Sequence, residues 1–119
     1  MRGPMIRTAL ALSLLVLAFP VSASAARTCS LSLNQQRHSG ATYLVQLKVS
    51  GVTCSTGLKV EKAWQSCRRA TAGKTTCHKS VLGYKSTQKI LGESKVEYDA
   101  KVTATNGSRR VTFTYQQNK

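Results

Sequence analysis

Residues 96–115 constrain the fold of this chain more than any other stretch, because two independent signals agree there. Apolar or small side chains alternate with polar ones on both sides of Asn106-Gly107. A period of two is typical of strands with one buried face. Asn-Gly between two such strands favours a tight turn, because both residues accept positive φ angles. The sequence therefore predicts an antiparallel hairpin with a two-residue loop at Asn106-Gly107.

The predicted hairpin has one apolar and one polar face. With this loop Thr105 faces Ser108, and the apolar pairs are Val102–Val111, Ala100–Phe113 and Tyr98–Tyr115. The polar face carries Glu97, Asp99, Lys101, Thr103 and Arg110. Because the side-chain period is two, we expect one face to be buried and the other to meet water.

Strand patterns also occur upstream of the hairpin. Ala41–Ser50 alternates, and is expected to bury Tyr43, Val45, Leu47 and Val49 on one face. The other predicted elements are a partner strand at Cys29–Leu33, a loop at Asn34–Gly40, a strand at Lys79–Gln88 and a turn region at Ile90–Lys95.

One helix is predicted between the strands. Thr53 or Ser55 can cap its start, and Gly73 marks its stop. An apolar stripe with helical spacing is formed by Val60, Ala63, Trp64 and Cys67. Gly57 in the first turns suggests close packing there or a later start. The predicted fold is α+β: one helix, with Trp64 at its centre, packs on a mostly antiparallel sheet of four to five strands.

The N-terminal segment has the three parts of a secretory signal peptide. Arg2 and Arg7 give a positive start, Ala9–Phe19 is an apolar run, and Ala23-Ser24-Ala25 supplies the small residues before a cleavage site. The apolar run is shorter than the ~20 residues that span a bilayer. We expect residues 1–25 to be a removed signal peptide and residues 26–119 to be a single small secreted domain without a transmembrane segment.

Four cysteines in an exported chain are expected to form two disulfides that staple the domain. A helix would hold Cys54 and Cys67 about 20 Å apart at 1.5 Å per residue, whereas bridged Cα atoms lie within about 7 Å. Two pairings remain. We favour Cys29–Cys54 with Cys67–Cys77 over the other, which is Cys29–Cys67 with Cys54–Cys77. No close pair of metal ligands is present, so neither a metal site nor a cofactor is predicted.

The charge of the chain favours anionic partners. It has 18 Lys and Arg against 4 acidic residues, a formal net charge of +14. Such a field attracts nucleic acid, acidic glycans, wall polymers or anionic lipid. Nucleic acid is not expected as the natural ligand of a secreted protein whose aromatic rings are predicted to point into the core. The predicted anionic-ligand patch consists of Lys59, Lys62, Arg68, Arg69, Lys74 and Lys79, with Lys85, Lys89 and Lys95 as further candidates.

No catalytic residues are predicted. A small secreted nuclease is the one enzyme to consider, because Glu97, Asp99, Lys101 and Arg110 share the polar hairpin face. The two histidines, His38 and His78, lie elsewhere in the chain, and no nucleophile motif appears. We therefore expect a binding protein rather than an enzyme.

The chain resembles a group of small secreted bacterial α+β domains that contain cysteines and are of unassigned function. The resemblance rests on Gly51–Lys62 (GVTCSTGLKVEK), Gly83-Tyr84 and Thr105–Tyr115 (TNGSRRVTFTY). It implies export and this fold, and it implies no activity or site residues. In such domains cysteines often stand where this chain has Ser86 and Ala104, so the resemblance implies that a strand-to-strand bridge has been lost here.

The sequence thus predicts a secreted basic domain that attaches to an anionic polymer or an anionic cell surface. The alternative is an inhibitor or toxin-like effector that acts on a protein partner or a membrane. An inhibitor needs a rigid exposed loop, for which Asn34–Gly40 and Ala70–Thr76 are the candidates.

Overall fold

A computed structural model describes residues 3, 25–71 and 75–119. The predicted signal peptide, apart from Gly3 and Ala25, lies outside the described residues, as do Gly73 and Lys74. None of the described helices is both long and apolar enough to cross a membrane.

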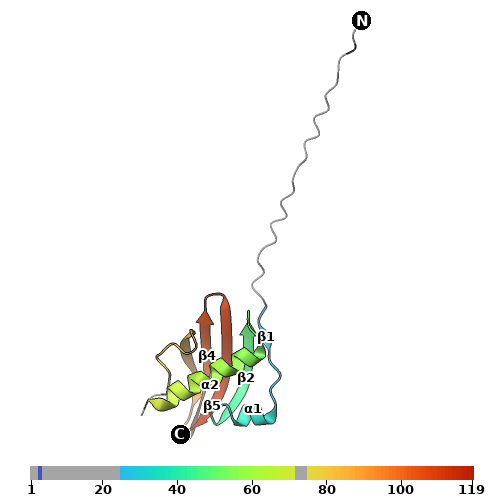
Figure 1. The fold of residues 1–119 in the computed structure, drawn as a ribbon. Helices are drawn as coiled ribbons and strands as arrows, with labels where there is room; N and C mark the ends of the chain where they lie inside the picture. The colour runs from blue at the N-terminus through green and yellow to red at the C-terminus, as the bar shows by residue number, and fades with distance from the viewer. Residues whose placement is uncertain (1–2, 4–24, 72–74) are drawn as a thin grey trace.

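Five antiparallel strands form one sheet, and one long helix packs across it (Figure 1). The sheet order is β1-β2-β5-β4-β3. This arrangement confirms the predicted α+β fold. The elements in chain order are β1 (Arg27–Thr28), α1 (Leu33–Arg37), β2 (Tyr43–Ser50), α2 (Cys54–Ala70), β3 (Lys85–Glu93), β4 (Glu97–Asn106) and β5 (Arg109–Asn118).

Helix α2 begins where its capping residue predicts. The Thr53 hydroxyl accepts a hydrogen bond from the backbone N–H of Thr56 at 3.1 Å, which satisfies one of the free donors of the first turn. Gly57 lies against β2, and a Cβ atom at this position would collide with the Val49 side chain. The close packing suggested by Gly57 is therefore confirmed. The helix ends at Ala70, before the predicted stop at Gly73.

Trp64 lies on the face of α2 that packs against the sheet, as predicted. It is fully buried, and its ring centroid lies 5.4 Å from that of Phe113 and 5.7 Å from that of Tyr115. Its indole N–H donates to the Ser86 hydroxyl at 2.8 Å. Ser86 lies directly opposite Ala104 in the β3–β4 register. A buried indole needs a hydrogen-bond acceptor, so Ser86 has a structural role in this chain.

The two disulfides are Cys29–Cys54 and Cys67–Cys77, with Cα–Cα distances of 5.7 Å and 5.3 Å. This is the favoured pairing of the two that geometry allowed. The first bridge joins the chain just after β1 to the first residue of α2. The second joins the last turns of α2 to the segment that leads into β3. Both ends of α2 are therefore fixed to other parts of the chain.

The segment after Cys29 differs from the prediction. Residues Leu33–Arg37 form helix α1 where the end of a strand and the start of a loop were expected, and the strand β1 is earlier and shorter. A capping box explains the helix. The Ser32 hydroxyl accepts from the Gln35 N–H at 3.1 Å, and the Gln35 side chain accepts from the Ser32 N–H at 2.9 Å. One of the two candidate inhibitor loops is thus largely helical.

The strand predicted at Lys79–Gln88 is displaced along the sequence. Val81 and Tyr84 exchange backbone hydrogen bonds of 3.0 Å and 2.8 Å. Leu82 and Gly83 between them have φ angles of +50° and +82°, as in a tight type I′ turn. The strand begins only after this turn. It runs through the start of the predicted Ile90–Lys95 turn region, and the connection to β4 lies at residues 94–96.

The final hairpin has the predicted strands with a different loop. Asn106 pairs with Arg109, so the loop is Gly107-Ser108, and Gly107 has φ +59°. Glycine in the first loop position is typical of a type II′ turn. Val102 consequently faces Phe113, and Ala100 faces Tyr115. The register changes by an even number of residues, so each side chain stays on its predicted face.

Strand β2 also departs from strict alternation. Its register with β5 shifts between Leu44 and Gln46. Leu44, Leu47 and Val49 are buried, whereas Val45 is 47 % exposed and Tyr43 is half-buried. A β-bulge explains the difference, because one extra residue reverses the faces on one side of it.

Candidate functional site

The side of the sheet away from α2 is open to solvent. Along β4 and β5 the core residues alternate with residues that are exposed or half-buried. We call the surface formed by this second set the open face. Its neighbouring positions on β1, β2 and β3 follow from the strand register.

The open face carries cations on four adjacent strands. All five are exposed: Lys48 on β2, Arg110 on β5, Lys101 on β4, and Lys85 and Lys89 on β3. Short hydroxyl side chains separate them. One row across the sheet reads Thr87, Thr103, Thr112 and Lys48, each directly opposite the next. The surface is therefore basic and lined with hydrogen-bond donors.

Two of these cations oppose each other directly. Lys89 on β3 is the cross-strand partner of Lys101 on β4, and both are exposed on the same face. Like charges at directly opposed positions destabilise a sheet, by up to about 1 kcal/mol. The fold thus tolerates an unfavourable pair between its edge strand β3 and the neighbouring strand β4.

Acidic side chains lie at one end of the sheet or in the core. The chain has four. Glu93 forms an ion pair of 2.7 Å with Lys119, Glu97 accepts from Gln116, and Asp99 faces Gly92. These three flank the connection between β3 and β4. The fourth, Glu61, is a residue of α2 and is fully buried. Glu97 and Asp99 are on the open face, and Asp99 is two positions from Lys101 on the same strand, so these acids border the five cations at the end of the sheet near the β3–β4 connection.

Three of the five cations surround a hollow. Lys48, Lys101 and Arg110 line it together with Thr112, Ser50, Val49 and Ala26, and its volume is about 140 Å³. Thr112 is the centre of this arrangement: Lys48 is directly opposite, and Arg110 is two positions earlier on the same strand. Lys101 is diagonal to Thr112, because its direct partner is Thr114.

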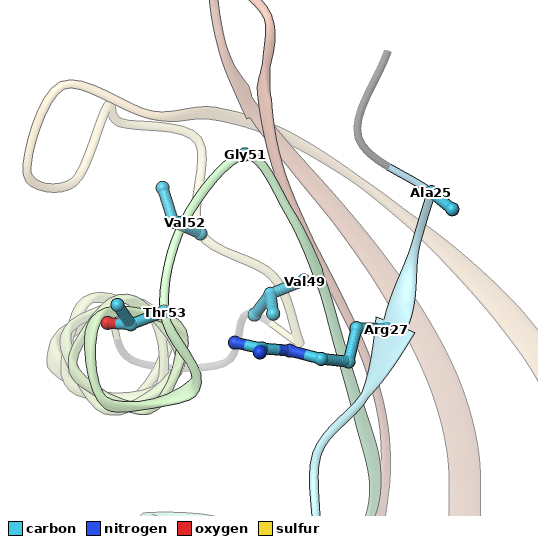
Figure 2. Close-up of a pocket in the computed structure, with 6 residues that line it drawn as sticks. All are labelled: Ala25, Arg27, Val49, Gly51, Val52 and Thr53. Atoms are coloured by element: carbon cyan, nitrogen blue, oxygen red, sulfur yellow. The ribbon is translucent and has the colours of Figure 1, made fainter. Parts of the chain in front are cut away.

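Two larger hollows are lined in part by Ala25. One, of about 470 Å³, lies between β1 and the start of α2, and the Arg27 side chain extends across it (Figure 2). It has a single cation. The other, of about 460 Å³, lies at the β4–β5 hairpin, where Arg109 and Arg110 line it. Arg110 is common to this hollow and the one around Thr112, so the basic surface continues to the hairpin tip.

The predicted anionic-ligand patch does not form one surface with Lys85 and Lys89 on β3. Lys59, Lys62 and Arg69 are exposed on α2, on the opposite side of the sheet from Lys85 and Lys89. Lys79 is exposed in the segment before β3. Lys74 lies outside the described residues.

Arg68 was predicted as part of the patch, and the structure places it in the interior. Its Nε donates to Gln65 Oε1 at 2.7 Å, and its Nη2 donates to Gln117 Oε1 at 3.1 Å and the Gly40 carbonyl at 3.3 Å. Its guanidinium lies 5.3 Å from the centroid of the Tyr115 ring. These contacts occupy the side chain, so Arg68 does not face an external ligand.

Glu61 lies in the same buried polar cluster. It is fully buried, and neither carboxylate oxygen has a hydrogen-bond partner. Burial raises the pKa of Glu61 to about 8, against the opposing influence of the Gln65 amide and of the nearby positive charges, including Arg68. Burial also raises the pKa of Tyr115, whose hydroxyl donates to Gln88 at 2.5 Å. A substrate in solution has no access to this carboxyl group.

The residues considered for nuclease chemistry are not gathered at one place. Lys101 and Arg110 line the hollow around Thr112, whereas Glu97 and Asp99 do not line it, although Asp99 is two positions from Lys101 on β4. His38 is at the end of α1, and His78 is beside Cys77. In the part of the chain that the structure describes, no three His, Cys, Asp or Glu side chains are grouped to hold a metal ion.

Aromatic rings are mostly withdrawn into the core. Trp64, Tyr84, Tyr98, Phe113 and Tyr115 are all buried. Tyr43 is half-buried and pairs with Gln116 on the open face, at the opposite end from Arg110. The side chains between the five cations are hydroxyls rather than aromatic rings on which bases could stack.

The grouping of Lys48 with Lys101 and Arg110 was not predicted from the sequence. Alternation assigned all three to polar faces, which is correct. The sequence pattern of a strand does not show which other strand it pairs with. The pairing of β2 with β5, which brings Lys48 close to Arg110, therefore could not be predicted.

No protein-family model, curated protein or solved structure matches this chain.

Proposed function

We propose that this protein is a secreted binding domain that attaches to an anionic extracellular polymer through the open face of its sheet. The observation that carries the proposal is the set of five exposed cations on four adjacent strands, which outnumber the two acids, Glu97 and Asp99, at one end of the same face. A surface of one sign raises the local concentration of ligands of the opposite sign.

A sheet suits a repeating ligand because it holds its side chains at fixed intervals. Neighbouring strands lie about 4.8 Å apart, and residues on one face recur about every 6.8 Å along a strand. A polymer with regularly spaced charges can contact several cations at once, so that each further contact forms within an existing complex. Displaced counterions add to the free energy of binding at low salt.

The Lys89–Lys101 pair supports the same proposal. Directly opposed lysines cost stability in the free protein. An anionic group between them would remove that repulsion, so part of the binding energy comes from relief of an unfavourable contact. The disulfides and the predicted signal peptide are typical of a protein that works outside the cytosol.

The test compares two triple variants that each remove three positive charges. One carries Lys89→Thr, Lys101→Thr and Arg110→Thr on the open face. The matched control carries Lys59→Gln, Lys62→Gln and Arg69→Gln on the exposed side of α2. Each is titrated with salt while bound to polyglycerol phosphate, dextran sulfate and polyglutamate, and circular dichroism verifies the fold of both.

We expect the open-face variant to elute at markedly lower salt than the parent, with a smaller dependence of binding on salt. The helix variant should stay close to the parent. Equal losses in the two variants would mean that net charge alone governs attachment, and the proposal would be wrong. Reduced and alkylated protein, which keeps the charges without the fold, should bind more weakly than the folded parent.

A further inference from the structure

The hollow around Thr112 has a more specific chemistry than the rest of the open face. We infer that it is a subsite for one tetrahedral oxyanion, a phosphate or sulfate group. This inference deepens the proposed function, and it rests on it only for the claim that the group belongs to a polymer.

The shape of the hollow follows from side-chain length. Thr112 is short, and its neighbours Lys48, Lys101 and Arg110 are long. On a pleated surface the side chains stand roughly perpendicular to the sheet. Three long chains around a short one therefore form a concavity, with the threonine at its floor and the cationic ends at its rim, and Ala26, Val49 and Ser50 complete its lining.

The three cations are available to a ligand. Within residues 25–71 and 75–119 the one ion pair joins Lys119 to Glu93, at the other end of the sheet. Lys48, Lys101 and Arg110 come from three different strands, so their positions do not depend on the conformation of one loop. The backbone hydrogen bonds of β2, β5 and β4 hold them in register.

The donors suit a tetrahedral group better than a planar one. Arg110 offers a planar fork that can hold two oxygens of one anion. The two lysines act as point charges on separate sides, and the threonine hydroxyl can donate from below. A phosphate or sulfate presents oxygens in all these directions. A carboxylate has two oxygens in one plane, so it cannot meet all four groups.

The first measurement is an NMR titration of ¹⁵N-labelled protein with inorganic phosphate, inorganic sulfate and acetate at constant ionic strength. The expected result is a saturable shift of the Thr112 amide and of the amides of the three cationic residues with the tetrahedral anions, and no saturable shift there with acetate. Equal responses to acetate would overturn the inference. The phosphate and sulfate arms show which of the two groups is preferred.

Two variants that keep the charge provide the sharper test. Thr112→Val removes only the hydroxyl group at the floor, and Arg110→Lys removes only the fork. Thr103→Val is the matched control, since Thr103 lies directly opposite Thr112 on β4 and contributes nothing to the charge. Loss of a hydrogen bond to a charged group should weaken phosphate binding about tenfold in Thr112→Val, with no change in Thr103→Val.

The two proposals fail in different ways. If polymer binding falls in the open-face triple variant while Thr112→Val and Arg110→Lys bind phosphate and polymer like the parent, the subsite is refuted and the polymer proposal stands. If phosphate binds at the hollow and depends on the Thr112 hydroxyl while polymer binding is governed by net charge alone, the subsite stands without the polymer. Circular dichroism of each variant shows that the fold is retained.

Discussion

The two sides of the sheet handle charge in opposite ways. On the side covered by α2, the charged residues Glu61 and Arg68 are buried, and Arg68 makes its contacts within the protein. On the open face, Lys89 and Lys101 are set against each other with no acid between them. On the covered side, Arg68 is paired within the protein and burial favours the neutral form of Glu61. On the open face, Lys89 and Lys101 have no partner of opposite charge between them. The difference fits the proposal that the covered side serves the fold and that the open face binds an anionic partner.

The largest loss of stability should come from replacing Trp64, which lies at the centre of the covered side. Trp64→Ala deletes a fully buried ring that contacts Phe113 and Tyr115. A core aromatic replaced by alanine costs about 3–5 kcal/mol, a large part of the stability of a small domain. Urea unfolding followed by circular dichroism measures the loss. Lys62→Ala, on the exposed side of the same helix, should change stability by less than about 0.5 kcal/mol, and a similar loss in both variants would contradict this account.

The second prediction concerns the buried carboxyl group. The folded-state pKa of Glu61 is about 8, raised from an ordinary value of 4.5. Between these values the unfolded chain loses the Glu61 proton and the folded chain keeps it. Stability should therefore fall as pH rises from about 4.5 to 8, by up to about 1.4 kcal/mol per unit, and then level off. Glu61→Gln should remove this slope and be more stable than the parent at pH 8.

The control for this prediction is Glu93→Gln. Glu93 is exposed and forms the ion pair with Lys119, a contact worth about 0–1 kcal/mol. Its replacement should leave the pH dependence unchanged. Unfolding midpoints in urea at pH 5 and pH 8 decide the question. A parent protein with equal stability at both values would show that Glu61 is ionised in the folded state.

The smallest effect is expected on the open face, and there stability and binding should move in opposite directions. Lys89→Glu turns a like-charge pair with Lys101 into an attractive one, and should stabilise the fold by about 0.2–1 kcal/mol. It should also weaken attachment to the polyanion. Lys85→Glu makes the same charge change opposite Thr105, where no like-charge partner exists, and should not stabilise. A destabilised Lys89→Glu would refute the cost assigned to the pair.

Sequence patterns predicted the fold where local signals and burial agree. The final hairpin alternates cleanly because both its strands have one buried face. The loop residue was mistaken because Gly107 can occupy the first or second position of a two-residue turn, and both choices keep every side chain on its face. The packing of β5 against β2 on its other edge adds a constraint that the hairpin sequence alone does not contain.

The displaced strand β3 shows where local patterns are insufficient. It is the edge of the sheet, and most of its residues are exposed, so alternation is weak there. Val81 and Leu82, which lie inside the predicted strand, belong to the tight turn before β3. Likewise, the helical pattern centred the buried stripe near Ala63, whereas the helix is rotated so that Glu61 and Gln65 face inward. Only contacts with other elements determine that rotation.

The order of the strands has a consequence for how the chain acquires its structure. Strand β5 is the last in the sequence, and it lies between β2 and β4 in the middle of the sheet. As the chain emerges N-terminus first, the earlier elements can form only two separate pieces, β1 with β2 and β3 with β4. Neither is expected to be stable alone, since isolated two-stranded units are marginal in water. The ten residues of β5 follow all the other strands and unite both halves, so the sheet cannot be completed before they are available.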